Sequence, residues 1–199
     1  NDDITISGPG WSAILCGVWS NKHLSVDNSF ITTDYINYPP FFKFVEDFNS
    51  NLHTASICNW DPINDYIVQN HTDYKLNVSS DQDVSLQASA YLSNNDPDVM
   101  FLHFDDVDHA GHANGFSPNV SQYITAIEGV DSYISPIIQS IYQRPDYTNE
   151  DWLILITTDH GGLGTSHGGN SIEEERVFVI ASGNSITQNI IRKDSVLIF

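Results

Sequence analysis

Short apolar runs that alternate with longer, helix-like segments are the feature that most limits how this chain can fold. The runs at 99–104, 152–157 and 176–181 are typical of strands, and 54–58 is a weaker candidate. Because the run at 152–157 is apolar almost throughout, we expect both of its faces to be buried. Strands alternating with helices predict an α/β domain with a mainly parallel central sheet and helices on both faces.

The segments between these strands predict helices. After Ser117 and Pro118, a candidate N-cap and first helical residue, apolar side chains recur every three or four residues. Pro136 predicts a kink or break in that helix, because proline removes a backbone hydrogen bond. Three further segments are expected to be helical: 9–18, 40–52 and 81–94.

Length and chain ends indicate how the domain is organised. The chain has 199 residues without a repeat or a linker-like segment, so residues 1–199 are expected to form one domain. It starts at Asn1 without an initiator Met and stops inside the apolar run 196–199, so we expect a domain truncated at its first strand and at its C-terminus. No apolar stretch is long enough to cross a bilayer.

The charge balance limits the partners. Seven Lys and Arg stand against 26 Asp and Glu, a formal net charge of −19. Such a surface repels nucleic acid and anionic lipid, so we expect neither as a partner. An excess of carboxylates is suited to binding divalent cations. An acidic surface that only keeps the protein soluble would give the same excess of negative charge without a metal site. Cys16 and Cys58 are too few for a thiolate zinc cluster or a disulfide scaffold, and both lie in apolar runs.

Carboxylates and imidazoles follow two of the expected strands. Asp108 and His112 come after the first strand, Asp159 and His160 come after the second, and a Gly-rich loop then brings His167. Open α/β sheets bind ligands beyond the carboxyl ends of their strands. Two such clusters and a third His therefore predict a divalent-metal site with oxygen and nitrogen ligands, rather than purely structural pairs.

Neighbouring polar residues have weaker signals. Asp105 and Asp106 are candidates for outer partners that orient a ligating His. His109 lies between two ligands in the sequence and is expected to point aside. His103 lies within the strand and is expected to be a core or interface residue.

The start of the chain supplies a hydroxyl group. Ser7 stands two residues before Pro9, which we expect to open an apolar helix. A helix N-terminus receives anionic groups such as phosphate or sulfate. Ser7 could instead be a simple N-cap, but beside a metal cluster a metal-activated Ser attacking phosphorus becomes the better hypothesis. Thr5 is the competing hydroxyl, and its spacing to the Pro fits less well.

These motifs resemble the alkaline phosphatase superfamily, and within it the type I phosphodiesterase/nucleotide pyrophosphatase branch, from about residue 5 to residue 183. The family nucleophile lies two residues before a Pro that starts a helix, and Ser7 stands there in place of the branch's usual Thr. Asn28 falls at the place of a phosphate-binding Asn. The metal motifs Asp-x-x-x-His-x-x-Gly, Asp-His-Gly and a last His are matched by Asp108, His112 and Gly115, by Asp159, His160 and Gly161, and by His167.

The resemblance implies an alkaline-phosphatase-like fold with a two-metal site. Ser7 would form a covalent intermediate, and Asn28 with the backbone N–H groups after Ser7 would hold the nonbridging oxygens. Imidazole and carboxylate ligands favour two zinc ions, with manganese as the alternative. The implied ligands are Asp108, His112 and His167 for one ion, and Asp159, His160 and the Ser7 oxygen for the other.

One part of the family pattern is missing. The family takes another Asp for the second metal from the end of its first strand, upstream of the nucleophile. Only six residues precede Ser7, and Asp2 and Asp3 lie too close to it to come from that strand. We therefore expect the first strand to belong to a longer parent, and the 199-residue piece to bind its second ion weakly.

The predicted function is metal-dependent hydrolysis of a small-molecule phosphate ester, with a phosphodiester or nucleotide pyrophosphate favoured. The alternatives are a phosphomonoesterase, a sulfatase-type hydrolase and a noncatalytic metal- or anion-binding relative. The sulfatase is disfavoured because Trp11 stands where that group has Arg. The resemblance implies an extracellular or periplasmic location. Three glycosylation acceptor patterns, at Asn70, Asn77 and Asn119, would matter only if the protein is secreted. The oligomeric state is left open.

Overall fold

A three-stranded parallel sheet forms the centre of the protein. The computed structural model describes residues 4–190. The strand order is β2 (Tyr74–Asn77), β1 (Thr54–Cys58), β3 (Val99–His103). β1 pairs in parallel with both neighbours, and its residues Thr54 to Cys58 face Val99 to His103 of β3. The weak candidate at 54–58 is thus the central strand, and all five of its residues are buried.

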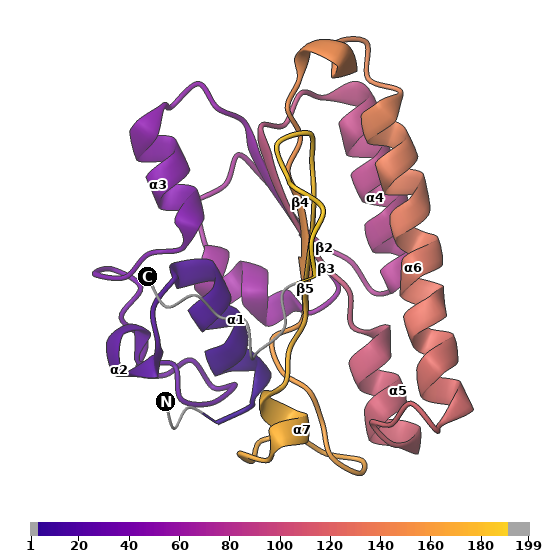
Figure 1. Cartoon of the computed structure of the whole chain (residues 1–199). Helices are drawn as coiled ribbons and strands as arrows, with labels where there is room; N and C mark the ends of the chain where they lie inside the picture. The colour runs from indigo at the N-terminus through magenta and orange to yellow at the C-terminus, as the bar shows by residue number, and fades with distance from the viewer. Residues whose placement is uncertain (1–3, 191–199) are drawn as a thin grey trace.

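Helices cover both faces of this sheet, as predicted. α4 (Asp81–Asn94), α5 (Asp106–Asn114) and α6 (Ser121–Tyr142) lie on one side, and α1 (Ser7–Cys16), α2 (Ser20–His23) and α3 (Phe41–Phe48) lie on the other (Figure 1). Side chains of a strand alternate between its faces. Ile57 therefore joins the core under α4 and α6, while Cys58 joins the core that contains Trp11 and Leu15 of α1. The remaining short helices are η1 (Ile63–Val68), η2 (Tyr147–Asn149) and α7 (Ile172–Glu175).

The last two strands differ from the prediction. β4 (Ile154–Thr157) and β5 (Val179–Ser182) form a separate antiparallel pair, in which Ile154 faces Ser182. A parallel pairing requires a long crossover, and the only helix between β4 and β5 in the described chain is the four-residue α7. The expectation that 152–157 is buried on both faces is wrong, because Leu155 is 62% exposed.

The long helix α6 also corrects the prediction. It begins at Ser121, because Ser117 instead closes a turn by accepting hydrogen bonds from the N–H groups of Asn119 and Val120. It continues through Pro136 without a break. The buried side chains of Ile137 and Ile141 pack with residues of α4, and this packing outweighs the one hydrogen bond that proline removes.

The other predicted helices are confirmed with shifted ends. α4 has the expected bounds, α1 begins at Ser7 rather than Pro9, and α3 ends at Phe48 because Asn49 is extended. None of the helices within residues 4–190 has the length and apolarity that a bilayer crossing demands.

Candidate active site

Asp108, His112 and His167 form a compact group of metal-ligating side chains. Asp108 and His112 lie four residues apart on α5 and so share one helix face. His112 Nε2 and His167 Nε2 are 3.0 Å apart, and both are 3.4–3.5 Å from the carboxylate oxygens of Asp108. The three residues offer ligand atoms that all lie within 4.8 Å of one another. This is the predicted first ligand set, brought together by α5 and the loop after β4.

A hydrogen bond to a backbone carbonyl orients each of three imidazoles. The Nδ1 atoms of His112, His160 and His167 lie 3.0, 2.8 and 2.8 Å from the carbonyl oxygens of Thr165, Gly161 and Thr5. A carbonyl only accepts, so this network assigns the proton to Nδ1 in each ring and leaves Nε2 with a lone pair. The lone pairs of His112 and His167 then converge at 3.0 Å, an arrangement that a shared cation would stabilise.

The second group joins the nucleophile candidate to Asp159 and His160. Ser7, the first residue of α1, donates from Oγ to His160 Nε2 at 3.3 Å. Asp159 Oδ2 lies 3.4 Å from the same Nε2 atom. The rings of His160 and His167 stack with centroids 3.8 Å apart, so the two groups adjoin. Thus all the predicted metal ligands and Ser7 meet in one place.

Burial sets the electrostatics of the site. Desolvation raises the pKa of Asp159 to about 7 and lowers the pKa values of His160 and His167. Within residues 4–190, Asp108 Oδ1 and Asp159 Oδ2 are buried oxygens with no hydrogen-bond donor. Buried carboxylate oxygens normally have partners, and a divalent cation would supply one here.

Asn28 contacts the helix that carries Ser7. Its Oδ1 accepts a hydrogen bond from the N–H of Gly8 at 2.7 Å, which leaves Nδ2 as the donor for a ligand. The resemblance implied that backbone N–H groups after Ser7 hold phosphate oxygens. In the structure the Gly8 N–H is paired with Asn28, Pro9 has none, and the Gly10 N–H donates to Ile6.

The outer partners of the histidines are not those predicted. The backbone N–H groups of Asp105 and Asp106 donate to the buried carboxylate of Asp81. The Asp105 side chain pairs with His109, which is largely exposed and points aside as expected. We expected Asp105 and Asp106 to orient the rings of the ligating histidines. Backbone carbonyl oxygens do this instead, by accepting from the ring Nδ1 atoms.

Phe116 and Glu174 are supporting residues that sequence reasoning missed. The Phe116 ring lies edge-on to His112 and His167, with centroids 5.4 and 6.0 Å apart. A Cβ at Gly162 would lie 2.3 Å from this ring, so glycine is needed there. Glu174 accepts hydrogen bonds from the N–H groups of Gly169 and Ser171. The capping-box spacing of Ser171 and Glu174 was a signal available in the sequence.

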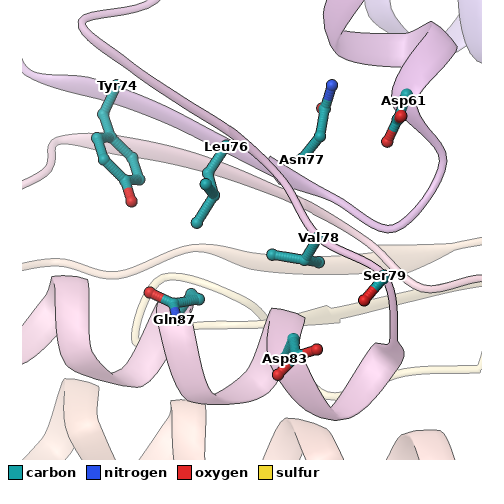
Figure 2. A pocket seen from close by; sticks show the side chains of 8 residues that line it. All are labelled: Asp61, Tyr74, Leu76, Asn77, Val78, Ser79, Asp83 and Gln87. Atoms are coloured by element: carbon teal, nitrogen blue, oxygen red, sulfur yellow. The ribbon is translucent and has the colours of Figure 1, made fainter.

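The site does not coincide with either of two hollows in the surface. Figure 2 shows a pocket of about 520 Å³ between β2 and the start of α4, lined by Tyr74, Leu76 and Gln87 among others. A second hollow of about 460 Å³ adjoins Asp105, Asp106 and His109. Neither is lined by a predicted metal ligand or by Ser7, so ligand chemistry rather than volume locates the candidate site.

Comparisons with known proteins identify the family and the fold. Residues 3–181 match the family described as type I phosphodiesterase / nucleotide pyrophosphatase. The human GPI ethanolamine phosphate transferase 2 catalytic subunit is 30% identical over 117 residues, which are 58% of this chain and 11% of that protein.

Two solved structures share the fold. The periplasmic domain of the phosphoethanolamine transferase EptC from Campylobacter jejuni has a TM-score of 0.65 at 11% identity, covering 92% of this chain and 66% of that one. Murine ectonucleotide pyrophosphatase/phosphodiesterase 5 has a TM-score of 0.60 at 18% identity, covering 81% and 47%. The chain thus spans about a tenth of the curated relative, and 66% and 47% of these two solved chains. The predicted alkaline-phosphatase-like α/β fold is confirmed.

Proposed function

Because the chain belongs to the type I phosphodiesterase/nucleotide pyrophosphatase family, we propose that it is a divalent-metal-dependent enzyme that cleaves phosphodiester or nucleotide-pyrophosphate bonds with Ser7 as its nucleophile. The observation that carries the proposal is the 3.3 Å contact between Ser7 Oγ and His160 Nε2 at the edge of the Asp/His cluster. This contact supports the role of Ser7, because its hydroxyl lies directly beside the proposed metal ligands.

The ligand chemistry supports two cations. Asp108, His112 and His167 would hold one ion, and Asp159, His160 and Ser7 would share the other. Their nitrogen and oxygen donors suit zinc, with manganese as the alternative. Bound there, the ions would lower the pKa of a hydroxyl and offset negative charge on the phosphoryl oxygens.

The chain's own groups then have defined tasks. Ser7 gives up its hydroxyl proton to water as Oγ bonds to phosphorus. The bond from phosphorus to the leaving oxygen breaks, and that oxygen departs with the bonding electron pair and takes up a proton from water. Water next cleaves the phosphoserine ester and restores Ser7. Asn28 Nδ2 donates to a nonbridging oxygen, whose charge grows as Oγ attacks.

The lack of side-chain cations at the site favours a diester over a monoester. Among residues 4–190, no Lys or Arg makes a hydrogen bond or ion pair with Ser7, Asn28 or the proposed ligands. A monoester brings two negative charges into a chain of net charge −19, whereas a diester brings one.

Phosphoryl-group transfer to an alcohol is the second candidate. It is favoured by the 30% identity to a protein named as an ethanolamine phosphate transferase. Transfer uses the same Ser7 intermediate, with an acceptor alcohol in place of water. The exposed side of His112 leaves the site open enough for such an acceptor.

The comparisons also support an extracytoplasmic location, since one structural relative is a periplasmic domain. Of the three glycosylation patterns, Asn70 and Asn119 are exposed, whereas the Asn77 amide donates to Asp65.

The test is Ser7→Ala in the longest natural polypeptide that contains these residues. With zinc or manganese, we expect the change to lower the kcat for bis(4-nitrophenyl) phosphate by roughly a thousandfold or more. Ser93→Ala, the same change at an exposed residue of α4, is the matched control and retains activity.

The other outcomes separate the alternatives. Equal turnover by the wild type and Ser7→Ala would refute the nucleophile. Metal binding without turnover of either protein would favour a noncatalytic relative. Faster turnover of 4-nitrophenyl phosphate or sulfate would favour a monoesterase or a sulfatase. If added ethanolamine accepts the phosphoryl group in place of water, so that less hydrolysis product forms, the result would favour the transferase.

A further inference from the structure

We propose that Thr5 is a positioning residue, whose hydroxyl clamps the loop that carries His167 to the segment that carries Ser7. This inference rests on the proposed function, because His167 is one of the proposed metal ligands. It assigns a task to a hydroxyl that the sequence offered only as a competing nucleophile.

Three hydrogen bonds join Thr5 to the loop. Its Oγ1 donates to the carbonyl of Gly169 at 2.8 Å and accepts from the N–H of Gly168 at 3.0 Å. Its own carbonyl accepts from His167 Nδ1 at 2.8 Å. Thr5 thus contacts three consecutive residues that lie more than 160 positions away in the sequence.

The residues after His167 need such an anchor, because the loop's bonds from Phe116 to Gly164, between Leu163 and Ser166, and from His112 to Thr165 all lie before His167. Gly164 and Gly168 have φ values of +61° and +112°, a region that only glycine enters freely. Glycine-rich segments lose much conformational entropy when they are ordered. Within the described chain, Glu174 holds the N–H of Gly169 from the other side at 2.8 Å. His167 therefore lies beside two anchors, Thr5 and Glu174.

The clamp determines where His167 Nε2 points. The Thr5 hydroxyl sets the position of Gly168 and Gly169, and this position brings the His167 ring to the Thr5 carbonyl. The bond to that carbonyl directs Nε2 toward Asp108 and His112, as the proposed ion requires. The hydroxyl is engaged as both donor and acceptor, which makes it a poor nucleophile beside Ser7.

The experiment compares Thr5→Val, which removes the hydroxyl and keeps the shape, with Thr5→Ser, which restores it. We expect Thr5→Val to weaken Zn²⁺ affinity in a competition titration by roughly tenfold or more, and Thr5→Ser to retain it. The Co²⁺ absorption spectrum should change in Thr5→Val alone. Turnover of Thr5→Val should recover at saturating metal.

Controls separate folding from positioning. Thr148→Val removes a hydroxyl at an exposed residue of η2 and should leave Zn²⁺ affinity unchanged. Circular dichroism should show that every variant is folded. A further arm uses Ser7→Ala, which should abolish turnover while the ion at Asp108, His112 and His167 still binds.

Three results would overturn the inference. Unchanged Zn²⁺ affinity and Co²⁺ spectrum in Thr5→Val would show that the hydroxyl does not position the ligand. Unchanged affinity with turnover lost at every metal concentration would instead identify Thr5 as the nucleophile. A wild type that binds no divalent cation would refute the proposed function itself, and the Thr5 inference with it.

Discussion

His103 is a buried imidazole outside the proposed metal site. It ends β3, and its ring lies edge-on to Trp11 and within 6.4 Å of Trp60. Burial lowers the pKa of His103 to about 3. The folded protein therefore keeps this ring neutral at a pH where the unfolded chain protonates it.

This difference predicts acid sensitivity. Below the unfolded pKa of about 6.5, the unfolded state binds a proton that the folded state does not, so stability falls as the pH drops from 6.5 toward 3. One proton corresponds to a slope of about 1.4 kcal/mol per pH unit near pH 5. Urea unfolding between pH 4.5 and 7 should show this slope, and His103→Phe should reduce it by about that amount.

Other histidines contribute to the same slope in both proteins, so the difference between them isolates His103. Phe101→Leu, an apolar change beside the same Trp11 ring, is the control and should leave the slope unchanged because it removes no titrating group. If His103→Phe retained the full slope, the buried neutral ring would be the wrong cause.

That these residues lie close together was predictable, but how they are held was not. Asp108 and His112 are four residues apart, which puts both on one face of a helix, and the Asp-His-Gly motif directly follows a strand. The local sequence pattern was therefore sufficient to predict that these residues come together. The Nδ1 partners are backbone carbonyls of Thr5, Gly161 and Thr165. Every residue has a carbonyl, so no residue type marks such a partner in a sequence.

At the scale of elements, two helical glycines have opposite roles. A Cβ at Gly111 of α5 would lie 2.2 Å from the Phe116 ring, whereas a Cβ at Gly129 of α6 would meet open space. Gly111 therefore permits a close approach of Phe116, which supports the proposed ligand His112, while Gly129 only lowers helix propensity.

The matched substitutions have opposite expected signs. Gly111→Ala should destabilise the protein by about 1–3 kcal/mol, because the ring must move. Gly129→Ala should stabilise it by about 0.5–1 kcal/mol through helix propensity. Denaturant unfolding of both variants measures the difference. A neutral Gly111→Ala would show that Phe116 can shift at no cost, and its supporting role would then be withdrawn.

Element boundaries were predictable where local signals agreed with packing. α4 has its predicted bounds, and Ser80 caps it by accepting from the N–H of Asp83. Pro136 predicted a break, yet tertiary packing of α6 overrides this local penalty. The direction of β5 depends on how the chain returns after α7, and apolar composition carries no information about direction.

At the scale of the whole molecule, charge repulsion is the main electrostatic term. The net charge is −19, and within residues 4–190 only Lys43 and Arg144 pair their side-chain charges with carboxylates. Added salt therefore screens many repulsions and few attractions.

We expect the Tm of the metal-free protein to rise when NaCl is increased from about 20 mM to about 500 mM, because the screening length then falls from tens of ångströms to a few. Differential scanning calorimetry at fixed pH in the presence of a chelator measures this. KCl at the same concentrations is the control and should raise the Tm equally, because screening depends on ionic strength and not on which ions supply it. A Tm that falls with salt would mean that attractive pairs dominate and would contradict the prediction.

The sequence by itself determined the α/β class, the ligand types and their order along the chain, because these follow from local periodicity and from residue chemistry at strand ends. Only the tertiary structure decided the antiparallel return of β5, the direction of the imidazole lone pairs and the use of Thr5 as a clamp. Each of these depends on which distant backbone groups meet, and Thr5 and Gly169 meet only after the chain between them has folded.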